Sequence, residues 1–333
     1  MKKMPAKILV IRFSSIGDIV LTSPVVRCLK MQLGAEVHFL TKKKFAEIAY
    51  SNPHIDKVIA FESDLSSILE ELKKEQYDCI VDLHHNLRSI RVSLALGIKA
   101  YRFAKLNFRK WLLVRFKINR MPAMHIVDRY MESLIPLGIV NDGQGLDFFI
   151  PSEEEVNTTD FSLDLTHGYH AVVCGATYYT KSIPEEKIIA LGQKSRLPFL
   201  LLGSKADWEK AERIRNVLGE KVFNACGAYS LHQSASLIKQ SASVLTPDTG
   251  LMHIAAALRK PIVSLWGNTV PEFGMYPYLA KDSSIEMSVV MEVKNLPCRP
   301  CSKLGHAQCP QKHFKCMQMQ DENAILKALE REN

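Results

Sequence analysis

The chain is most easily placed by the features that it lacks. No stretch of its 333 residues approaches the roughly 18 uninterrupted apolar residues of a transmembrane helix, so we expect a chain that does not cross a membrane. It has no internal repeat and no low-complexity tract, which excludes repeat architectures. It also has no Asp-x-Asp pair, and a single glycine, Gly17, follows the first strand candidate where a phosphate-binding loop would be Gly-rich.

Acidic residues are missing from one long segment. No Asp or Glu occurs between Asp82 and Asp128, whereas ten Lys or Arg do. The other 33 basic and 35 acidic residues nearly cancel, so this segment accounts for the net charge of +8. Basic and aromatic residues alternate over residues 101–116, which fits three interpretations: a helix with a solvated basic face, a surface for an anionic membrane, or a nucleic-acid site.

The bulk composition is typical of a soluble chain with two domains, since 47% of the residues are apolar and 23% are charged. Arg12 and Asp18 interrupt the apolar N-terminal run, and no small-residue cleavage site follows, so we expect no secretory signal. A cytoplasmic location is the prediction. There the eight cysteines would be reduced or metal-bound rather than disulfide-paired.

Strand and helix candidates alternate along almost the whole sequence. In the first half, strand candidates at 8–13, 37–40, 57–61 and 79–82 alternate with helical patterns at 19–33, 43–51 and 65–75. In the second half, the strand candidates are 170–174, 199–202, 222–224, 244–246 and 261–266, and the helical ones are 185–194, 208–218, 231–239 and 251–258. This order predicts an α/β fold with parallel sheets. The acidic, polar segment 151–168 indicates a linker between an N-terminal domain, 1–155, and a C-terminal domain, 168–333.

The segment Ser14-Ser15-Ile16-Gly17-Asp18 follows a strand candidate and opens a helix. Open α/β sheets bind ligands at the carboxyl ends of their strands. Asp18 is therefore either a helix-start residue that complements the helix dipole or a general base.

A second segment of this kind runs from Pro247 to His253. Thr249 and Gly250 stand where helix N–H groups have no intrahelical partner, and such a helix start can bind phosphate. Asp248 or Thr249 could equally be an ordinary helix cap. His253, one turn further on, favours a ligand site.

Three more candidates follow strands in the second half. Lys181 lies in a loop from which it can reach a diphosphate, although a solvated loop lysine is the simpler interpretation. Asp207 and Glu209 lie where a carboxylate can hold ribose hydroxyls, although both also suit the acidic first turn of a helix.

Two segments together resemble glycosyltransferase family 9, the ADP-heptose:lipopolysaccharide heptosyltransferases. RFSSIGDIVLTSPVVR is similar to the N-terminal signature of that family, and PDTGLMHIAAAL is similar to its donor-site signature. The resemblance extends from Lys7 to near Met317. It implies a GT-B architecture, with two Rossmann-like domains whose parallel sheets face each other across a cleft and a C-terminal helix that can pack back on the first domain.

The resemblance also implies site residues. Asp18 would be the catalytic base, acting on the acceptor side. The donor would contact Thr177 and Lys181 with its diphosphate, Asp207 or Glu209 with its ribose, and Asp248, Thr249, Gly250 and His253 elsewhere. The family requires neither a cofactor nor a metal ion.

The expected function is inverting, metal-independent transfer of a heptose or related sugar from an ADP-sugar to a lipid-linked lipopolysaccharide core acceptor. Such an acceptor favours a peripheral position on the inner membrane surface and no nucleic-acid partner, with Arg102, Lys105, Arg109 and Lys110 facing the membrane. Two alternatives stay open: a same-fold transferase that uses another nucleotide sugar for a different surface glycan, and a non-catalytic nucleotide-sugar-binding protein. The presence of Asp18 together with Lys181 argues against the second, since binding alone needs no base.

A cysteine segment lies near the C-terminus. Cys298, Cys301, Cys309 and Cys316 follow a C-x2-C-x7-C-x6-C pattern with two interleaved histidines. This spacing is loose for a zinc site. We favour reduced thiols, with zinc as the alternative.

Overall fold

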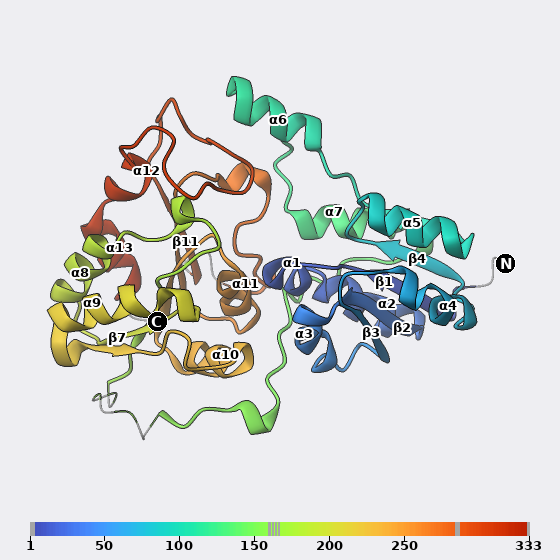
Figure 1. Cartoon of the computed structure of the whole chain (residues 1–333), viewed down its shortest axis with the longest axis horizontal. Helices are drawn as coiled ribbons and strands as arrows, with labels where there is room; N and C mark the ends of the chain where they lie inside the picture. The colour runs from blue at the N-terminus through green and yellow to red at the C-terminus, as the bar shows by residue number, and fades with distance from the viewer. Residues whose placement is uncertain are drawn as a thin grey trace. The chain divides into compact units, whose positions relative to one another are not determined.

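The computed structural model describes residues 4–158, 161, 163, 165, 167–283 and 287–331. The chain divides into two compact units, one formed by Met1–Lys105 and Met124–Phe149 and the other by Leu106–Ala123 and Ile150–Asn333. Each unit is built around a parallel sheet whose strands alternate with helices (Figure 1). The predicted α/β fold with parallel sheets is confirmed.

The sheet of the first unit has the strand order β3-β2-β1-β4-β5, and all of these neighbours pair in parallel. Its strands are β1 Lys7–Ile11, β2 Glu36–Lys42, β3 Lys57–Phe61, β4 Cys79–Asp82 and β5 Ala100–Arg102. The central strand β1 is a continuous apolar run with residues 8–11 buried, as expected for a strand that helices cover on both faces.

The helices of the first unit are α1 Ile16–Val20, α2 Ser23–Leu33, α3 Ala46–Tyr50, α4 Ser66–Lys74, α5 Leu87–Leu96 and α7 Ile126–Glu132, with 3-10 turns η1 Lys43–Phe45 and η2 Ile135–Leu137. Side chains of α4 and α5 pack on one face of the sheet. The helix expected over 19–33 is two helices, α1 and α2. The break falls at Thr22, whose hydroxyl donates to the Ile19 carbonyl at 2.6 Å, because Pro24 has no N–H and suits the first turn of a new helix.

The sheet of the second unit has the order β11-β10-β9-β6-β7-β8, again with parallel pairing. Its strands are β6 His170–Val173, β7 Phe199–Leu202, β8 Val222–Asn224, β9 Ser243–Pro247, β10 Ile262–Trp266 and β11 Ser288–Glu292. Its helices are α6 Asn107–Phe116, α8 Glu185–Lys194, α9 Trp208–Leu218, α10 Leu231–Gln240, α11 Gly250–Ala257, α12 Lys315–Gln318 and α13 Glu322–Leu329. The 3-10 turns are η3 Ser152–Glu154, η5 Tyr179–Lys181, η6 Lys205–Asp207, η7 Gly219–Lys221 and η8 Pro271–Phe273.

Side chains of α8, α9 and α13 form one core with the second sheet, and α10 and α11 pack against each other. The C-terminal helix α13 contacts α8, β9 and β10. Within the residues that the structure describes, no helix combines the length and the hydrophobicity needed to cross a bilayer.

The two units are not two consecutive halves of the chain. The segment Leu106–Ala123 belongs to the second unit, since Leu113 packs with Val270 and Phe273. The sequence pattern had assigned this segment to a domain that ended at residue 155. Residues 151–158, the start of the expected linker, lie along α10, where the Val156 N–H donates to the Ser236 hydroxyl at 3.0 Å. Residues 159, 160, 162, 164 and 166 of that linker lie outside the described residues.

Both sheets follow the Rossmann pattern. The chain starts in the middle of each sheet, adds strands toward one edge, and then returns to build the other edge. The point where this direction reverses lies between β1 and β4 in the first sheet and between β6 and β9 in the second. Ligands of open α/β sheets bind beyond the carboxyl ends of the strands at such switch points.

Candidate active site

Most of the candidate residues lie at the carboxyl ends of the strands that flank the two switch points. In the first unit, residues 12–18 lead from β1 into α1. In the second unit, residues 174–181 follow β6, and residues 248–250 lead from β9 into α11.

Asp18 lies in the first turn of α1, and two neighbours fix its carboxylate. Its Oδ1 is 2.5 Å from a guanidinium nitrogen of Arg12. Its Oδ2 accepts hydrogen bonds from the Ser15 N–H at 3.2 Å and the Ser15 hydroxyl at 2.9 Å. Burial would raise the pKa of Asp18, but the Arg12 charge and the Ser15 hydrogen bonds outweigh burial and hold this pKa below its ordinary value. Asp18 is therefore ionised at neutral pH and can accept a hydrogen bond or a proton.

Arg12 is a functional candidate that the sequence reasoning missed. Its side chain is buried and donates to the carbonyl oxygens of Ser14 at 2.9 Å and Leu83 at 2.5 Å, and to the Tyr130 hydroxyl at 3.1 Å. These bonds fix the cation that in turn orients Asp18. The signal in the sequence was a charged residue directly after a buried strand, which is costly unless it has a partner.

His84 follows β4 at the same switch point and was also missed. Its ring lies 4.7 Å from the ring of Phe13 between centroids. Burial lowers the pKa of His84 to about 3, and the charges of Arg12 and Lys105 act in the same direction, so the imidazole is neutral at pH 7. Its Nδ1 is buried and has no hydrogen-bond partner among the residues that the structure describes.

In the second unit, three side chains from three strand ends meet at the switch point. The Lys181 Nζ lies 2.6 Å from Asp248 Oδ2 and 3.3 Å from the Asp248 carbonyl oxygen. The Thr269 hydroxyl donates to the same Oδ2 at 2.9 Å. Lys181, Asp248 and Thr269 follow β6, β9 and β10, respectively. The carboxylate therefore holds the ammonium group where a ligand of the second sheet would bind.

The start of α11 lies beside this cluster. Thr249 is the N-cap residue, but its hydroxyl lies 3.3 Å from the Thr246 hydroxyl instead of capping the helix. Gly250 is the first helical residue. The first N–H groups of a helix together with its dipole attract an anion. His253 lies in the first turn and is buried, with 2% of its surface exposed.

Asp207 and Glu209 have different surroundings. Asp207 Oδ2 accepts hydrogen bonds from the Ser204 N–H at 2.8 Å and the Ser204 hydroxyl at 2.7 Å, which closes the turn after β7. The same carboxyl lies against Gly175, where an added Cβ would come within 2.2 Å of it. Glu209, in the first turn of α9, is exposed, and so is Thr177 after β6.

The cysteine segment forms hydrogen bonds with two of these loops. The sequence did not predict these contacts. The Thr180 N–H donates to the His306 carbonyl oxygen at 3.2 Å, and the His306 N–H donates to the Thr180 hydroxyl at 2.8 Å. Arg299 donates to the carbonyl oxygens of Gly267 at 2.6 Å and Thr269 at 3.0 Å. The segment that contains Arg299 and His306 thus holds the loops that carry Lys181 and Thr269.

None of these four cysteines forms a disulfide bond in this structure. Burial raises the pKa of Cys316 to about 12 and also raises the pKa of Cys301. Cys298 Sγ lies 3.9 Å from His313 Nε2. Among the described residues, one group of three side chains brings potential metal-ligand atoms close together, and it consists of Glu36, His38 and Glu75. The four cysteines of this segment are not part of that group. The preference for thiols over zinc stays a prediction.

The four basic residues expected at a membrane do not lie on one element. Arg102 ends β5, and its Nε lies 3.4 Å from the buried Asp82 carboxylate. Lys105 also belongs to the first unit, whereas Arg109 and Lys110 lie on α6 of the second unit. The Lys110 Nζ is 5.8 Å from the ring centre of Phe273.

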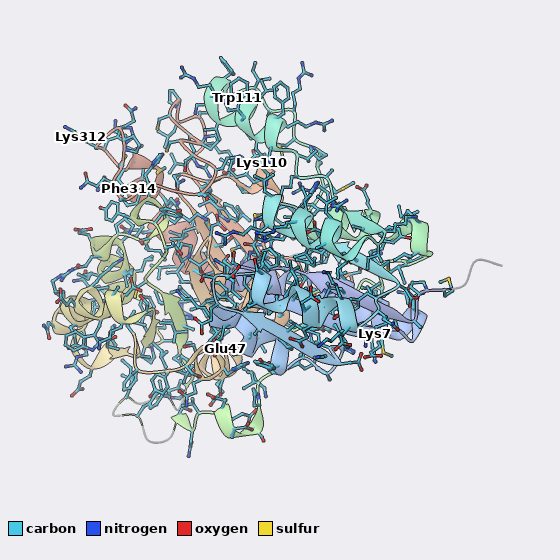
Figure 2. All side chains as sticks on the ribbon, turned by 45° about the vertical axis from the view of Figure 1, so that its right-hand side comes forward. Lys7, Glu47, Lys110, Trp111, Lys312 and Phe314 are labelled. Atoms are coloured by element: carbon cyan, nitrogen blue, oxygen red, sulfur yellow. The ribbon has the colours of Figure 1, made fainter. Side chains whose placement is uncertain are left out.

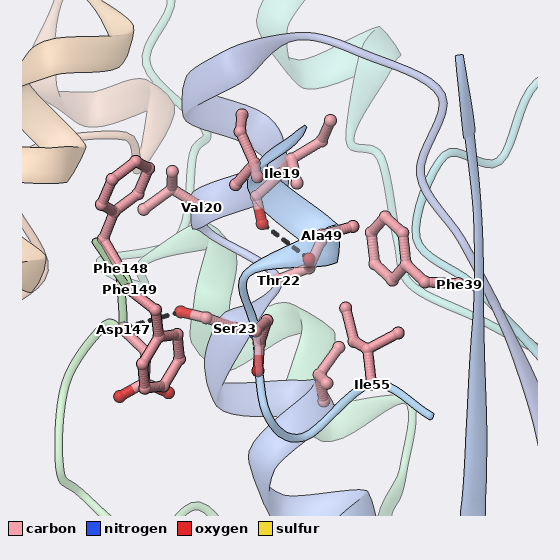
Figure 3. Close-up of a pocket in the computed structure, with 13 residues that line it drawn as sticks. Ile19, Val20, Thr22, Ser23, Phe39, Ala49, Ile55, Asp147, Phe148 and Phe149 are labelled. Atoms are coloured by element: carbon pink, nitrogen blue, oxygen red, sulfur yellow. Dashed lines mark hydrogen bonds between the residues drawn. The ribbon is translucent and has the colours of Figure 1, made fainter. Parts of the chain in front are cut away.

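A pocket lies beside α1 and α2 in the first unit (Figure 3). Ile19 and Phe39 are among the apolar side chains that line it. The Thr22 hydroxyl already donates to the Ile19 carbonyl oxygen, and the Ser23 hydroxyl accepts the Asp147 N–H at 2.8 Å. The hydroxyls of Thr22 and Ser23 are therefore already hydrogen-bonded within the protein, and we assign no ligand to this pocket.

Comparison with known families decides the class of protein. The family model for glycosyltransferase family 9 (heptosyltransferase) matches residues 65–307. The chain belongs to glycosyltransferase family 9. It is a glycosyltransferase, and its paired Rossmann-like sheets are those of the GT-B fold.

Relatives of this family 9 chain include lipopolysaccharide heptosyltransferase 1 of Pseudomonas aeruginosa, which is 26% identical over 332 residues that cover 89% of this chain and 86% of the relative. Lipopolysaccharide heptosyltransferase 2 of Escherichia coli is 25% identical, with 80% of this chain and 84% of the relative covered. Among solved structures, ADP-heptose lps heptosyltransferase II of E. coli superposes with a TM-score of 0.68 at 23% identity, covering 98% of this chain and 100% of the other. E. coli heptosyltransferase WaaC with ADP gives a TM-score of 0.66 at 19% identity, covering 97% and 99%.

Proposed function

We propose that this glycosyltransferase moves a heptose or related sugar from an ADP-sugar to a lipopolysaccharide core acceptor, by inverting, metal-independent transfer. The observation that carries the proposal is the cluster of Lys181, Asp248 and Thr269 beside the start of α11. It offers a cation and helix N–H groups to a diphosphate at the switch point of the second sheet. The names of the relatives, which are lipopolysaccharide heptosyltransferases, support the sugar and the acceptor.

The donor side of the reaction is assigned to the second unit. Lys181 and the N–H groups at Thr249 and Gly250 would stabilise the negative charge that develops on the leaving nucleoside diphosphate. Thr177, which is exposed after β6, would add a hydroxyl contact to the diphosphate. His253 would complete this end of the site from the first turn of α11.

The ribose contact is assigned to Glu209 rather than to Asp207. The Asp207 carboxylate already closes its own turn through Ser204 and packs against Gly175. Glu209 is exposed one turn further on, and a carboxylate after a Rossmann strand can accept hydrogen bonds from ribose hydroxyls.

The acceptor side is assigned to the first unit. Asp18 would take the proton of the acceptor hydroxyl while that oxygen attacks the anomeric carbon of the donor sugar. The C–O bond to the acceptor forms as the bond to the diphosphate breaks, which inverts the configuration of that carbon. Arg12 keeps Asp18 ionised and oriented, and the neutral His84 can accept a hydrogen bond from another hydroxyl of the acceptor.

Independence from metal is proposed on two grounds. The sequence has no Asp-x-Asp pair, and Lys181 with the start of α11 can neutralise the leaving group instead. We also propose a cytoplasmic enzyme that works at the inner face of the membrane, where a lipid-linked acceptor would be found.

A direct assay tests the proposal. Purified protein is incubated with ADP-heptose, with UDP- and GDP-sugars as alternatives, and with a deacylated lipopolysaccharide core acceptor. Mass spectrometry follows the product, and NMR gives its anomeric configuration. A product that is one heptose heavier, with inverted configuration, is expected from ADP-heptose. A product from another nucleotide sugar alone would change the donor, and nucleotide binding without any product would favour a binding protein.

A further inference from the structure

Helix α6 is apolar on two opposite sides. On one side, Leu113 is buried against Val270 and Phe273, and Val114 packs beside them. The Lys117 ammonium group at the end of the helix donates to the Pro300 carbonyl oxygen at 2.6 Å, which ties this side to the cysteine segment. The packed side of α6 is therefore already accounted for.

The opposite side of α6 carries large aromatic side chains in solvent. Phe108, Trp111 and Phe116 are 68%, 49% and 53% exposed. At 100° per residue, Phe108 lies opposite the packed side, and Trp111 and Phe116 flank it. Figure 2 labels Trp111 and Lys110 on this helix. Among the residues that the structure describes, three of the six exposed Phe, Trp or Tyr side chains lie on α6.

These aromatic side chains form a cluster rather than isolated exposures. The rings of Phe108 and Trp111 stack with centroids 5.8 Å apart, and the rings of Trp111 and Phe116 meet edge to face at 5.2 Å. A single exposed apolar residue needs no explanation, whereas a cluster marks an interaction surface.

The charges around the cluster point to an anionic partner. Arg109 and Arg115 are both exposed. At 100° per residue, Arg115 lies between Phe108 and Trp111 on the aromatic side, and Arg109 lies beside Phe116 at the edge of that side. The sequence has no acidic residue between Asp82 and Asp128 that could neutralise them. Aromatic residues next to Arg and Lys on one face are typical of a helix that lies in the interface of an anionic bilayer.

We propose that α6 docks this enzyme on an anionic lipid bilayer, with Phe108, Trp111 and Phe116 entering the boundary between headgroups and acyl chains. Arg109 and Arg115 contact the lipid phosphates. The packed side of α6 stays in contact with Val270 and Phe273, so the docked helix holds the second unit at the membrane surface.

This inference deepens the proposed function, because a lipid-linked acceptor lies in a membrane. It also replaces part of the surface expected from the sequence. Arg102 is paired with Asp82 in the first unit, and Lys110 lies near Phe273, so neither belongs to the exposed aromatic side of α6.

The test uses the full-length protein and vesicles without glycolipid, so that it does not depend on sugar transfer. Flotation compares vesicles of phosphatidylglycerol and phosphatidylethanolamine with vesicles of phosphatidylcholine alone. Trp111→Gln should weaken binding to the anionic vesicles about tenfold, through loss of a partly buried ring. Trp208→Gln is the matched control, because Trp208 is 50% exposed on a different helix, and its vesicle binding should equal that of the wild type.

Charge is tested separately. Arg109→Gln and Arg115→Gln should each weaken binding about fivefold, and the effect should fade at high salt. Brominated lipids should quench Trp111 fluorescence in the Trp208→Phe protein and should not do so after Trp111→Gln. Thermal unfolding and ADP binding, measured for each variant, should match the wild type, because the substituted side chains are exposed and lie outside the donor site.

Three outcomes would overturn the proposal. The first is equal binding of the wild type and Trp111→Gln to anionic vesicles, including no binding by either. The second is a concentration-dependent dimer that Trp111→Gln abolishes, which would make this side an interface between copies of the chain. The third is tighter binding to nucleic acid than to vesicles at physiological salt. Failure of the sugar-transfer assay would leave the vesicle result unchanged.

Discussion

Lys181 and Asp248, 67 positions apart in the sequence, form an ion pair of 2.6 Å across the switch point of the second sheet. The pair fixes the ammonium group before any ligand arrives, and the Thr269 hydroxyl donates a further hydrogen bond to the same carboxylate oxygen. A diphosphate would therefore meet a lysine whose position is already set, which lowers the entropy cost of binding.

Lys181→Ala should weaken ADP binding by about 10- to 100-fold, because a hydrogen bond to a charged group is worth about 1.5–3 kcal/mol. Sugar transfer should slow as well, since the lysine contacts the diphosphate in both the ground and transition states. Calorimetry with ADP measures the first effect and initial rates the second. Lys194→Ala, which removes an exposed lysine paired with Glu322, is the control. Unchanged ADP affinity in Lys181→Ala would place the diphosphate elsewhere.

Asp18→Asn should lower the rate of transfer by about 10²- to 10⁴-fold, because the amide cannot accept the proton of the acceptor hydroxyl. Affinity for ADP should stay at the wild-type level, since Asp18 serves the acceptor. Asp64→Asn is a matched control, because Asp64 also accepts a backbone N–H at the start of a helix. Wild-type turnover in Asp18→Asn would show that another group is the base.

Acid should destabilise the enzyme in a defined range. The folded pKa of His84, about 3, lies below its ordinary value near 6.5, so its contribution to stability is complete above about pH 6.5 and is lost as the pH falls toward 3. Asp18, whose pKa is also lowered, loses its contribution only below about pH 4. Urea unfolding at pH 7 and pH 4.5 should show a smaller loss of stability for His84→Gln than for the wild type. Equal losses in the two proteins would contradict the burial of a neutral imidazole.

Glu209→Gln and Asp207→Asn should separate ligand binding from stability. Glu209→Gln should weaken ADP binding by about tenfold with an unchanged free energy of unfolding, because the side chain is exposed. Asp207→Asn should cost about 0.5–2 kcal/mol of stability, because it weakens the bonds that close the turn after β7. The reverse pattern would return the ribose contact to Asp207.

Transfer should persist in EDTA, because Lys181 and the N–H groups of α11 are expected to stabilise the leaving group. Initial rates with and without chelator, after removal of free divalent ions, measure this. Loss of rate that magnesium restores would refute metal independence. Elemental analysis addresses the cysteine segment separately, and stoichiometric zinc would replace the expectation of free thiols. In that case prolonged chelation should lower stability before it lowers the rate.

The strands and the turns that follow them could be predicted because they depend on local pattern. Short apolar runs between helical patterns gave β3, β4, β7 and β8 with the bounds that the structure has. The switch-point segments around Asp18 and Asp248 also carry their signal locally, as polar residues between a buried strand and a helix.

Contacts between distant segments could not be predicted in this way. Thr269 and Arg299 act on the loops of the second site through hydrogen bonds that follow from the order of strands in the sheet, which no short sequence window contains. The assignment of α6 to the second unit depends on the packing of Leu113 against Phe273, about 160 positions away. Strand β5 has only three residues, which is too few for a recognisable strand pattern in the sequence. It is a strand because it pairs in parallel with β4.

The hydrogen bonds between the cysteine segment and the two loops of the second site limit how donor preference can be altered. His306 holds the loop that carries Lys181, and Arg299 holds the loop that carries Thr269. Gly305 lies so close to Tyr178 that an added Cβ would come within 2.4 Å of that side chain. In a chimera that takes only one of these loops from a relative, the new loop would lack the matching contacts that the other segments supply. To transfer donor specificity between family members, three segments should therefore be exchanged together, near residues 177–181, 267–269 and 299–306.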